Sequence, residues 1–139
     1  MASWLGLDLG EKRVGVAMSD ETTRLATPVT TLEIRGRNHL LKELTKLIDE
    51  YHVTKIVVGL PQTLKGEMGP AAQKVIEVVD WLKTSIDRTW IFWDERLSTQ
   101  EVERVLIEAD VRRDKRKQVR DQLAAQRILQ SYLDSHSKT

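Results

Sequence analysis

Residues 4–20 read WLGLDLGEKRVGVAMSD, and this stretch decides how the chain begins to fold. Its hydrophobic side chains alternate with small or polar ones, which is the period of a β-strand with one buried face. The pattern predicts two strands, over residues 3–9 and 13–19, which the short turn at residues 10–12 joins as a hairpin. The chain therefore opens with an antiparallel pair.

Asp8 is the unexpected residue of the first strand, because a carboxylate inside a sheet is costly unless a cation, backbone N–H groups or a metal ion compensates it. It shares one face of the strand with Trp4, Gly6 and Gly10. Glycines on that face predict open volume beside the carboxylate, which suits an ion or a ligand better than a salt bridge. The alternative is an ordinary turn aspartate, since Asp and Gly are common in hairpin turns.

The hydrophobic period changes several times after the hairpin. The expected elements are a strand at 29–34, a helix capped by Asn38 and carrying Leu40 to Ile48, a buried strand at 55–60, a glycine-rich loop at 61–70, a helix starting at Pro70, a strand at 89–93, and helices over 99–109 and about 115–134. This order predicts an α/β fold with a mixed sheet and helices on both faces.

Composition sets the broad class of the protein. The chain has 139 residues, 40% hydrophobic and 31% charged, which predicts a single globular domain over 1–139. It has no cysteine, which excludes disulfides, thiolate zinc sites and a cysteine nucleophile. The absence of a long apolar run or a signal-peptide pattern predicts a cytoplasmic protein without membrane contact. Net charge is only +1, but residues 112–120 hold six basic residues and one acid, which indicates either a solvated helix start or a nucleic-acid contact.

Two further acids stand where carboxylates are unusual. Glu95 follows the strand at 89–93, and ligands of α/β sheets gather beyond the carboxyl ends of parallel strands. The alternative for Glu95 is an exposed charged loop. Asp121 shares one helical face with four residues that are otherwise apolar or aromatic, Ala124, Ala125, Ile128 and Tyr132. A polar group on a buried face needs a partner, either a basic residue such as Arg127 or the other two acids.

The three acids together fit one chemistry. Carboxylates from separate elements bind Mg²⁺ or Mn²⁺, and two such ions about 3.5–4 Å apart activate water and stabilise the leaving oxygen in phosphodiester cleavage. The nearby cations that we expect to bind a sugar-phosphate backbone are Lys12, Arg13, Arg96, Lys115 and Lys117.

Four ordered motifs cover most of the chain: GLDLGEKRVGVAMSD (6–20), VVGLPQTLKGEMGP (57–70), DERLST (94–99) and KRKQVRDQLAAQRILQSYL (115–133). They resemble the YqgF-type family, whose members are described as pre-16S rRNA nucleases and as Holliday-junction resolvases. The resemblance implies a ribonuclease H-like fold, with a five-stranded mixed sheet whose first three strands are antiparallel. It also implies that Asp8, Glu95 and Asp121 are the catalytic, metal-binding acids. One departure is that Ala71 and Ala72 stand where family members often carry a basic residue.

Four functions remain to be compared. The leading one is a metal-dependent nuclease that trims a structured RNA, the 5′ side of the small-subunit rRNA precursor. A Holliday-junction resolvase acting on branched DNA is the second, and a non-catalytic rRNA-binding assembly factor is the third. An actin-like ATPase is the fourth, but that fold needs two domains and far more than 139 residues. We expect a monomer or a weak homodimer.

Overall fold

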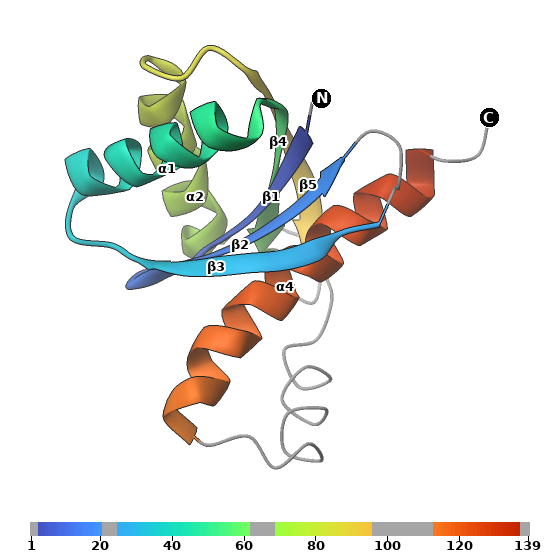
Figure 1. Cartoon of the computed structure of the whole chain (residues 1–139). Helices are drawn as coiled ribbons and strands as arrows, with labels where there is room; N and C mark the ends of the chain where they lie inside the picture. The colour runs from blue at the N-terminus through green and yellow to red at the C-terminus, as the bar shows by residue number, and fades with distance from the viewer. Residues whose placement is uncertain (1–2, 21–24, 62–68, 96–112, 137–139) are drawn as a thin grey trace.

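The computed structural model describes residues 3–20, 25–61, 69–95 and 113–136, with only the backbone for 94–95, 113–118 and 136 (Figure 1). Its elements are β1 (Ser3–Leu9), β2 (Arg13–Asp20), β3 (Thr27–Glu33), α1 (Arg37–Tyr51), β4 (Val53–Pro61), α2 (Pro70–Lys83), β5 (Thr89–Glu95) and α4 (Arg113–His136). Every predicted strand is confirmed to within two residues at each end. The helix predicted over 99–109 lies outside the described residues.

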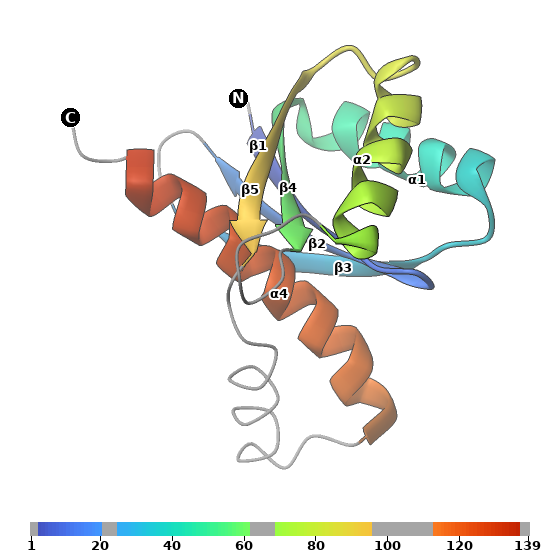
Figure 2. The same cartoon turned by 180° about the vertical axis from the view of Figure 1, so that it is seen from behind.

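The five strands form one mixed sheet in the order β3-β2-β1-β4-β5. β1 pairs antiparallel with β2, and β2 with β3, whereas β1–β4 and β4–β5 are parallel. The carboxyl ends of β1, β4 and β5 therefore lie at one edge of the sheet. Helices α1 and α2 cover one face and α4 crosses the other, as Figures 1 and 2 show. The predicted α/β architecture, with its antiparallel first three strands and helices on both faces, is confirmed.

Two hydrophobic cores follow from the alternation of β1. Leu5 and Leu7, both 0% exposed, lie in the core under α1 and α2. The stripe of α1 on this core repeats at four-residue spacing, with Leu40, Leu44 and Ile48 buried. The core under α4 consists mainly of α4 residues and central-sheet residues, namely Ala26, Val57, Ile128, Leu129, Tyr132 and Leu133, with Trp4, Ile91 and Trp93 packed against them. No helix in the described part of the chain combines the length and apolarity needed to cross a membrane.

The prediction that Asn38 caps α1 is wrong. The N-cap is Gly36, and no side chain makes a capping hydrogen bond there. Gly36 has φ 101°, a conformation that glycine adopts without the steric cost of a Cβ atom, so backbone geometry rather than a polar side chain starts the helix. By contrast, Pro70 occupies the first turn of α2 as predicted, where its missing N–H costs nothing.

Side-chain amides of α4 hydrogen-bond to Ala26, the residue that precedes β3. Gln126 Nε2 donates to the carbonyl of Ala26 at 2.9 Å, and the N–H of Ala26 donates to Oε1 of Gln130 at 2.8 Å. Both backbone groups of one residue are therefore paired by consecutive turns of α4. This arrangement limits sliding of the helix along the sheet.

We expect Leu129→Ala to lower the free energy of unfolding by about 2–5 kcal/mol, because Leu129 is 0% exposed and its removal leaves a cavity between α4 and β1. Leu25→Ala is the matched control: Leu25 is 59% exposed, so the same truncation should change stability by less than about 0.5 kcal/mol. Urea denaturation followed by circular dichroism measures both. Equal effects in the two variants would contradict the packing of α4 described above.

Candidate active site

Asp8 faces α4. A Cβ atom built on Gly6 would lie 2.7 Å from Cβ of Leu129 and 2.9 Å from the carbonyl oxygen of Ala125, so the Gly6 face of β1 is the face that α4 covers. Asp8 follows Gly6 by two residues and therefore points to the same side. The strand thus directs a half-buried carboxylate toward the helix that carries Asp121.

Gly15 lies beside both Asp8 and the backbone of Asp121. It is the register partner of Asp8 across β1 and β2. Directly paired residues of antiparallel strands place their Cβ positions about 4.5–5.5 Å apart on one face. A Cβ atom on Gly15 would overlap the backbone oxygen of Asp121. Two acids from opposite ends of the chain therefore flank one glycine at the carboxyl-end edge of the sheet.

The open volume expected beside Asp8 is not found at Gly6. The backbone of α4 and the side chain of Leu129 take up that space, because the absent Cβ atom lets the helix approach the strand. Gly15 does the same at Asp121, although no prediction from the sequence included it. A glycine inside an apolar strand often marks a place where another backbone approaches closely. Gly15 within the apolar stretch VGVAM (14–18) could therefore have predicted this contact.

Arg13 is the basic partner of Asp121. Its Nε donates to Oδ2 of Asp121 at 2.8 Å, and the two side chains are 26% and 14% exposed. The sequence had left open Arg127 or the other acids as partners. Arg13 opens β2, the strand that pairs with the strand of Asp8, and its positive charge balances the mostly buried negative charge of Asp121. The predicted buried face below Asp121 is confirmed at Ala125, Ile128 and Tyr132.

Glu95 ends β5 at the same edge of the sheet. Leu7 pairs with Val58 and Val58 with Phe92, so Glu95 lies two residues past the level of Asp8. Two strand spacings separate β5 from β1, about 10 Å. Glu95 follows Trp93 by two residues, so the two positions lie on the same face of β5. Trp93 packs in the core under α4. Its side chain lies outside the described residues.

The backbone places three of the predicted phosphate-binding residues, Lys12, Lys115 and Lys117, on the side of the turn between β1 and β2. Lys12 is exposed in the turn between β1 and β2. Lys115 and Lys117 belong to the first turns of α4, which extend past the sheet on the side of that turn (Figures 1 and 2). Their side chains, and the whole of Arg96, lie outside the described residues.

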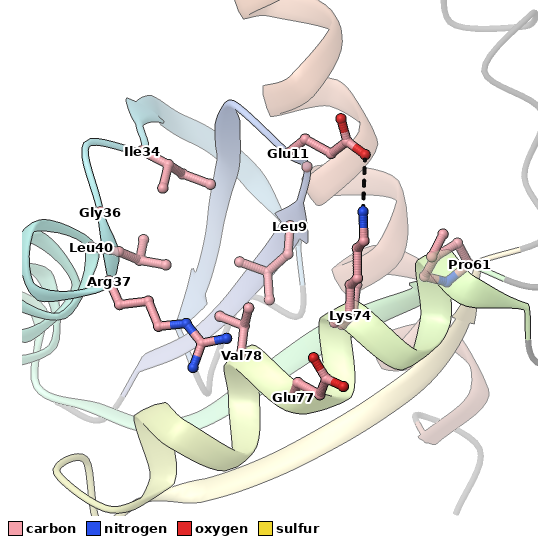
Figure 3. A pocket seen from close by; sticks show the side chains of 13 residues that line it. Leu9, Glu11, Ile34, Gly36, Arg37, Leu40, Pro61, Lys74, Glu77 and Val78 are labelled. Atoms are coloured by element: carbon pink, nitrogen blue, oxygen red, sulfur yellow. Dashed lines mark ion pairs between the residues drawn. The ribbon is translucent and has the colours of Figure 1, made fainter.

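A pocket of about 670 Å³ opens on the other face of the sheet, between α1, α2 and the end of β1 (Figure 3). Its walls are largely aliphatic, and an ion pair between Glu11 and Lys74, 3.6 Å apart, spans one side. Leu9 lines it, whereas the preceding residue, Asp8, points to the α4 face. Among the described side chains, neither Asp8 nor Asp121 lines this pocket, so it is separate from the face that these two acids share.

The acids fit a hard divalent cation. Asp8 and Asp121, whose backbones both adjoin Gly15, carry carboxylate oxygens, which are the donor type that Mg²⁺ and Mn²⁺ prefer. Among the side chains that the structure describes, no three His, Cys, Asp or Glu residues group as metal ligands. Glu95, the third predicted ligand, is not among those side chains.

Known proteins resemble this chain over nearly its whole length. Residues 2–135 match the family model RuvX, described as a Holliday junction resolvase. The chain is 47% identical over 132 residues to a protein of Thermoanaerobacter pseudethanolicus named "Putative pre-16S rRNA nuclease", and the match covers 94% of this chain and 95% of that relative. A protein of the same name from Desulforudis audaxviator is 45% identical over 131 residues, covering 94% and 93%.

Solved resolvase structures share the fold at low sequence identity. Thermus thermophilus RuvC in complex with a Holliday junction substrate has a TM-score of 0.60 and 10% identity, covering 100% of this chain and 98% of that one. Fowlpox virus resolvase with substrate Holliday junction DNA has a TM-score of 0.59 and 13% identity, covering 96% and 97%. This chain therefore belongs to the RuvX family of nucleases and has the ribonuclease H-like fold of the RuvC resolvases.

Proposed function

We propose that this nuclease is metal-dependent and processes the 5′ end of pre-16S rRNA in the cytoplasm during ribosome biogenesis, with Asp8, Glu95 and Asp121 as its catalytic acids. The observation that supports the proposal is that Asp8 and the backbone of Asp121 both adjoin Gly15. Carboxylates near the carboxyl ends of parallel strands are suited to metal-assisted phosphodiester hydrolysis. The RNA substrate is supported by the names of relatives at 45% and 47% identity.

The side chains would divide the work as follows. Asp8, Glu95 and Asp121 would hold Mg²⁺ or Mn²⁺, which supplies an activated water and offsets charge on the leaving oxygen when bound. Lys12 in the turn would bind a backbone phosphate at the edge of the site.

The first turns of α4 would extend this positive surface along the nucleic acid through Lys115 and Lys117, and Arg96 would add a cation after β5. Phosphate contacts of this kind orient the substrate without reading its sequence.

The proposal predicts cleavage of a labelled RNA that spans the 5′ leader and the start of 16S rRNA. With Mg²⁺ or Mn²⁺ we expect a product of defined length, and chelation by EDTA should reduce the rate at least about a hundredfold because the charge stabilisation is lost. Gel electrophoresis of the labelled strand measures the rate. RNA that binds but stays intact with either metal would instead indicate the non-catalytic assembly factor.

Holliday-junction resolution is the second candidate, and the description of the RuvX family favours it. A resolvase cuts two symmetric strands, which requires a two-fold dimer at the junction. A four-way DNA junction should therefore be assayed beside the RNA. We expect the RNA to be cleaved at least about tenfold faster, and paired symmetric nicks in the junction at a higher rate would reverse the assignment.

A further inference from the structure

The ion pair between Arg13 and Asp121 joins two residues for which the sequence predicts separate tasks. Asp121 would bind a metal ion, and Arg13 would bind a substrate phosphate. In the structure Oδ2 of Asp121 accepts a hydrogen bond from Nε of Arg13 at 2.8 Å. A metal ion on the same carboxylate would lie beside the guanidinium. Two cations repel strongly in a partly buried site, because water and salt screen their charges less there.

Movement of the backbone toward the sheet cannot relieve this conflict. The main chain of Asp121 lies directly on Gly15, and that of Ala125 on Gly6, so α4 is already in steric contact with the sheet. Arg13, by contrast, has a long side chain that is 26% exposed and starts its strand beside the exposed turn at residues 10–12. The arginine side chain is therefore the part of the pair with room to move.

We propose that Arg13 is an exchangeable counter-ion of the acid site: it pairs with Asp121 in the metal-free protein and turns to a backbone phosphate of the nucleic acid once Asp121 coordinates the ion. This inference rests on the proposed function. A guanidinium suits both partners, because its planar donors match carboxylate and phosphate alike. Metal and nucleic acid then bind with positive coupling, and each raises the affinity of the other by the same factor.

Arg13→Gln tests the exchange. Removal of the competing cation should tighten Mn²⁺ binding about tenfold, equivalent to about 1.4 kcal/mol. The same substitution should lower the melting temperature of the metal-free protein, because Asp121 loses its counter-charge while mostly buried. A purely structural arginine would lower stability and metal affinity together. Titration followed by the electron paramagnetic resonance of free Mn²⁺, together with thermal melting, separates the two roles.

The coupling itself is measured with Ca²⁺, used in place of Mg²⁺ to restrain cleavage, and a fluorescent precursor rRNA fragment. In the wild type, Ca²⁺ should strengthen RNA binding, because Arg13 is released to a phosphate. In Arg13→Gln the increase in RNA affinity caused by Ca²⁺ should be about fivefold smaller, because the variant has no guanidinium to release to a phosphate. Fluorescence anisotropy at constant ionic strength gives both affinities.

Lys12→Gln is the matched control, because it removes one positive charge from the neighbouring exposed position without breaking the ion pair. It should change Mn²⁺ affinity by less than about threefold. Arg13→Lys keeps the charge and should keep an Mn²⁺ affinity close to that of the wild type. Equal tightening in Arg13→Gln and Lys12→Gln, or no tightening in Arg13→Gln, would overturn the exchange.

Asp8→Ala separates failure of this inference from failure of the proposed function. If Asp8→Ala abolishes Mn²⁺ binding while Arg13→Gln leaves it unchanged, only the exchange is wrong. If the wild type binds no Mn²⁺, or binds it equally well after Asp8→Ala, the metal-dependent active site is wrong and the exchange with it.

Discussion

Asp8→Asn is expected to reduce cleavage of the precursor rRNA roughly a thousandfold, about 4 kcal/mol of transition-state stabilisation, while the protein still folds. Asn has almost the same shape as Asp, so the contacts of β1 with α4 are kept. It offers no anionic oxygen, so the proposed metal site loses one of the two acids that flank Gly15. Initial rates with Mg²⁺ and with Mn²⁺ measure the effect, and a cooperative thermal transition verifies folding.

Asp49→Asn is the matched control for this experiment. Asp49 is an exposed acid on α1, on the face of the sheet opposite the acid site, so the same chemical change there should alter the rate by less than about twofold. The proposed active site would be refuted by an Asp8→Asn protein, purified in parallel, that cleaves the RNA at the wild-type rate with unchanged metal dependence.

Gly15→Ala should destabilise the protein by about 3 kcal/mol, an unusually large effect for one added methyl group. The new Cβ atom would overlap the backbone oxygen of Asp121, and a helix backbone cannot rotate aside as a side chain can. The helix must therefore shift away from the sheet and carry Asp121 with it. A displacement of about 1 Å at a catalytic group costs about a hundredfold in rate, so activity should fall as well.

Gly36→Ala separates this steric effect from backbone strain. Gly36 has φ +101°, but a Cβ atom there would meet nothing within 4 Å. We expect a loss of about 1–2 kcal/mol from strain alone, with cleavage unchanged, because the start of α1 lies on the other face of the sheet. Urea denaturation and the RNA cleavage assay report both quantities. If Gly15→Ala is as stable and active as the wild type, α4 does not lie as close to β2 as described.

Local periodicity explains why so much of the fold could be predicted. The two-residue alternation of 4–20 and the four-residue spacing from Leu40 to Ile48 each report a buried face directly. The helix cap was mispredicted because it depends on the backbone conformation of Gly36. Asn38, two positions later, is a polar residue of the type that commonly caps helices, and it was therefore predicted as the cap. The open volume beside Asp8 was mispredicted because it depends on how closely α4, a helix far away in the sequence, packs against β1.

By itself, the sequence determined the order of the strands along the chain, the buried face of α4 and the chemical type of the three acids. These properties depend only on the residues themselves and on residues close to them in the sequence. Only the tertiary structure decided that Asp8 and the backbone of Asp121 both adjoin Gly15, and that Arg13 rather than Arg127 pairs with Asp121. The physical reason is that the ion pair joins Arg13 to a residue 108 positions away in the sequence. It depends on how closely α4 approaches the sheet, and that distance is set by glycines in two different strands acting together.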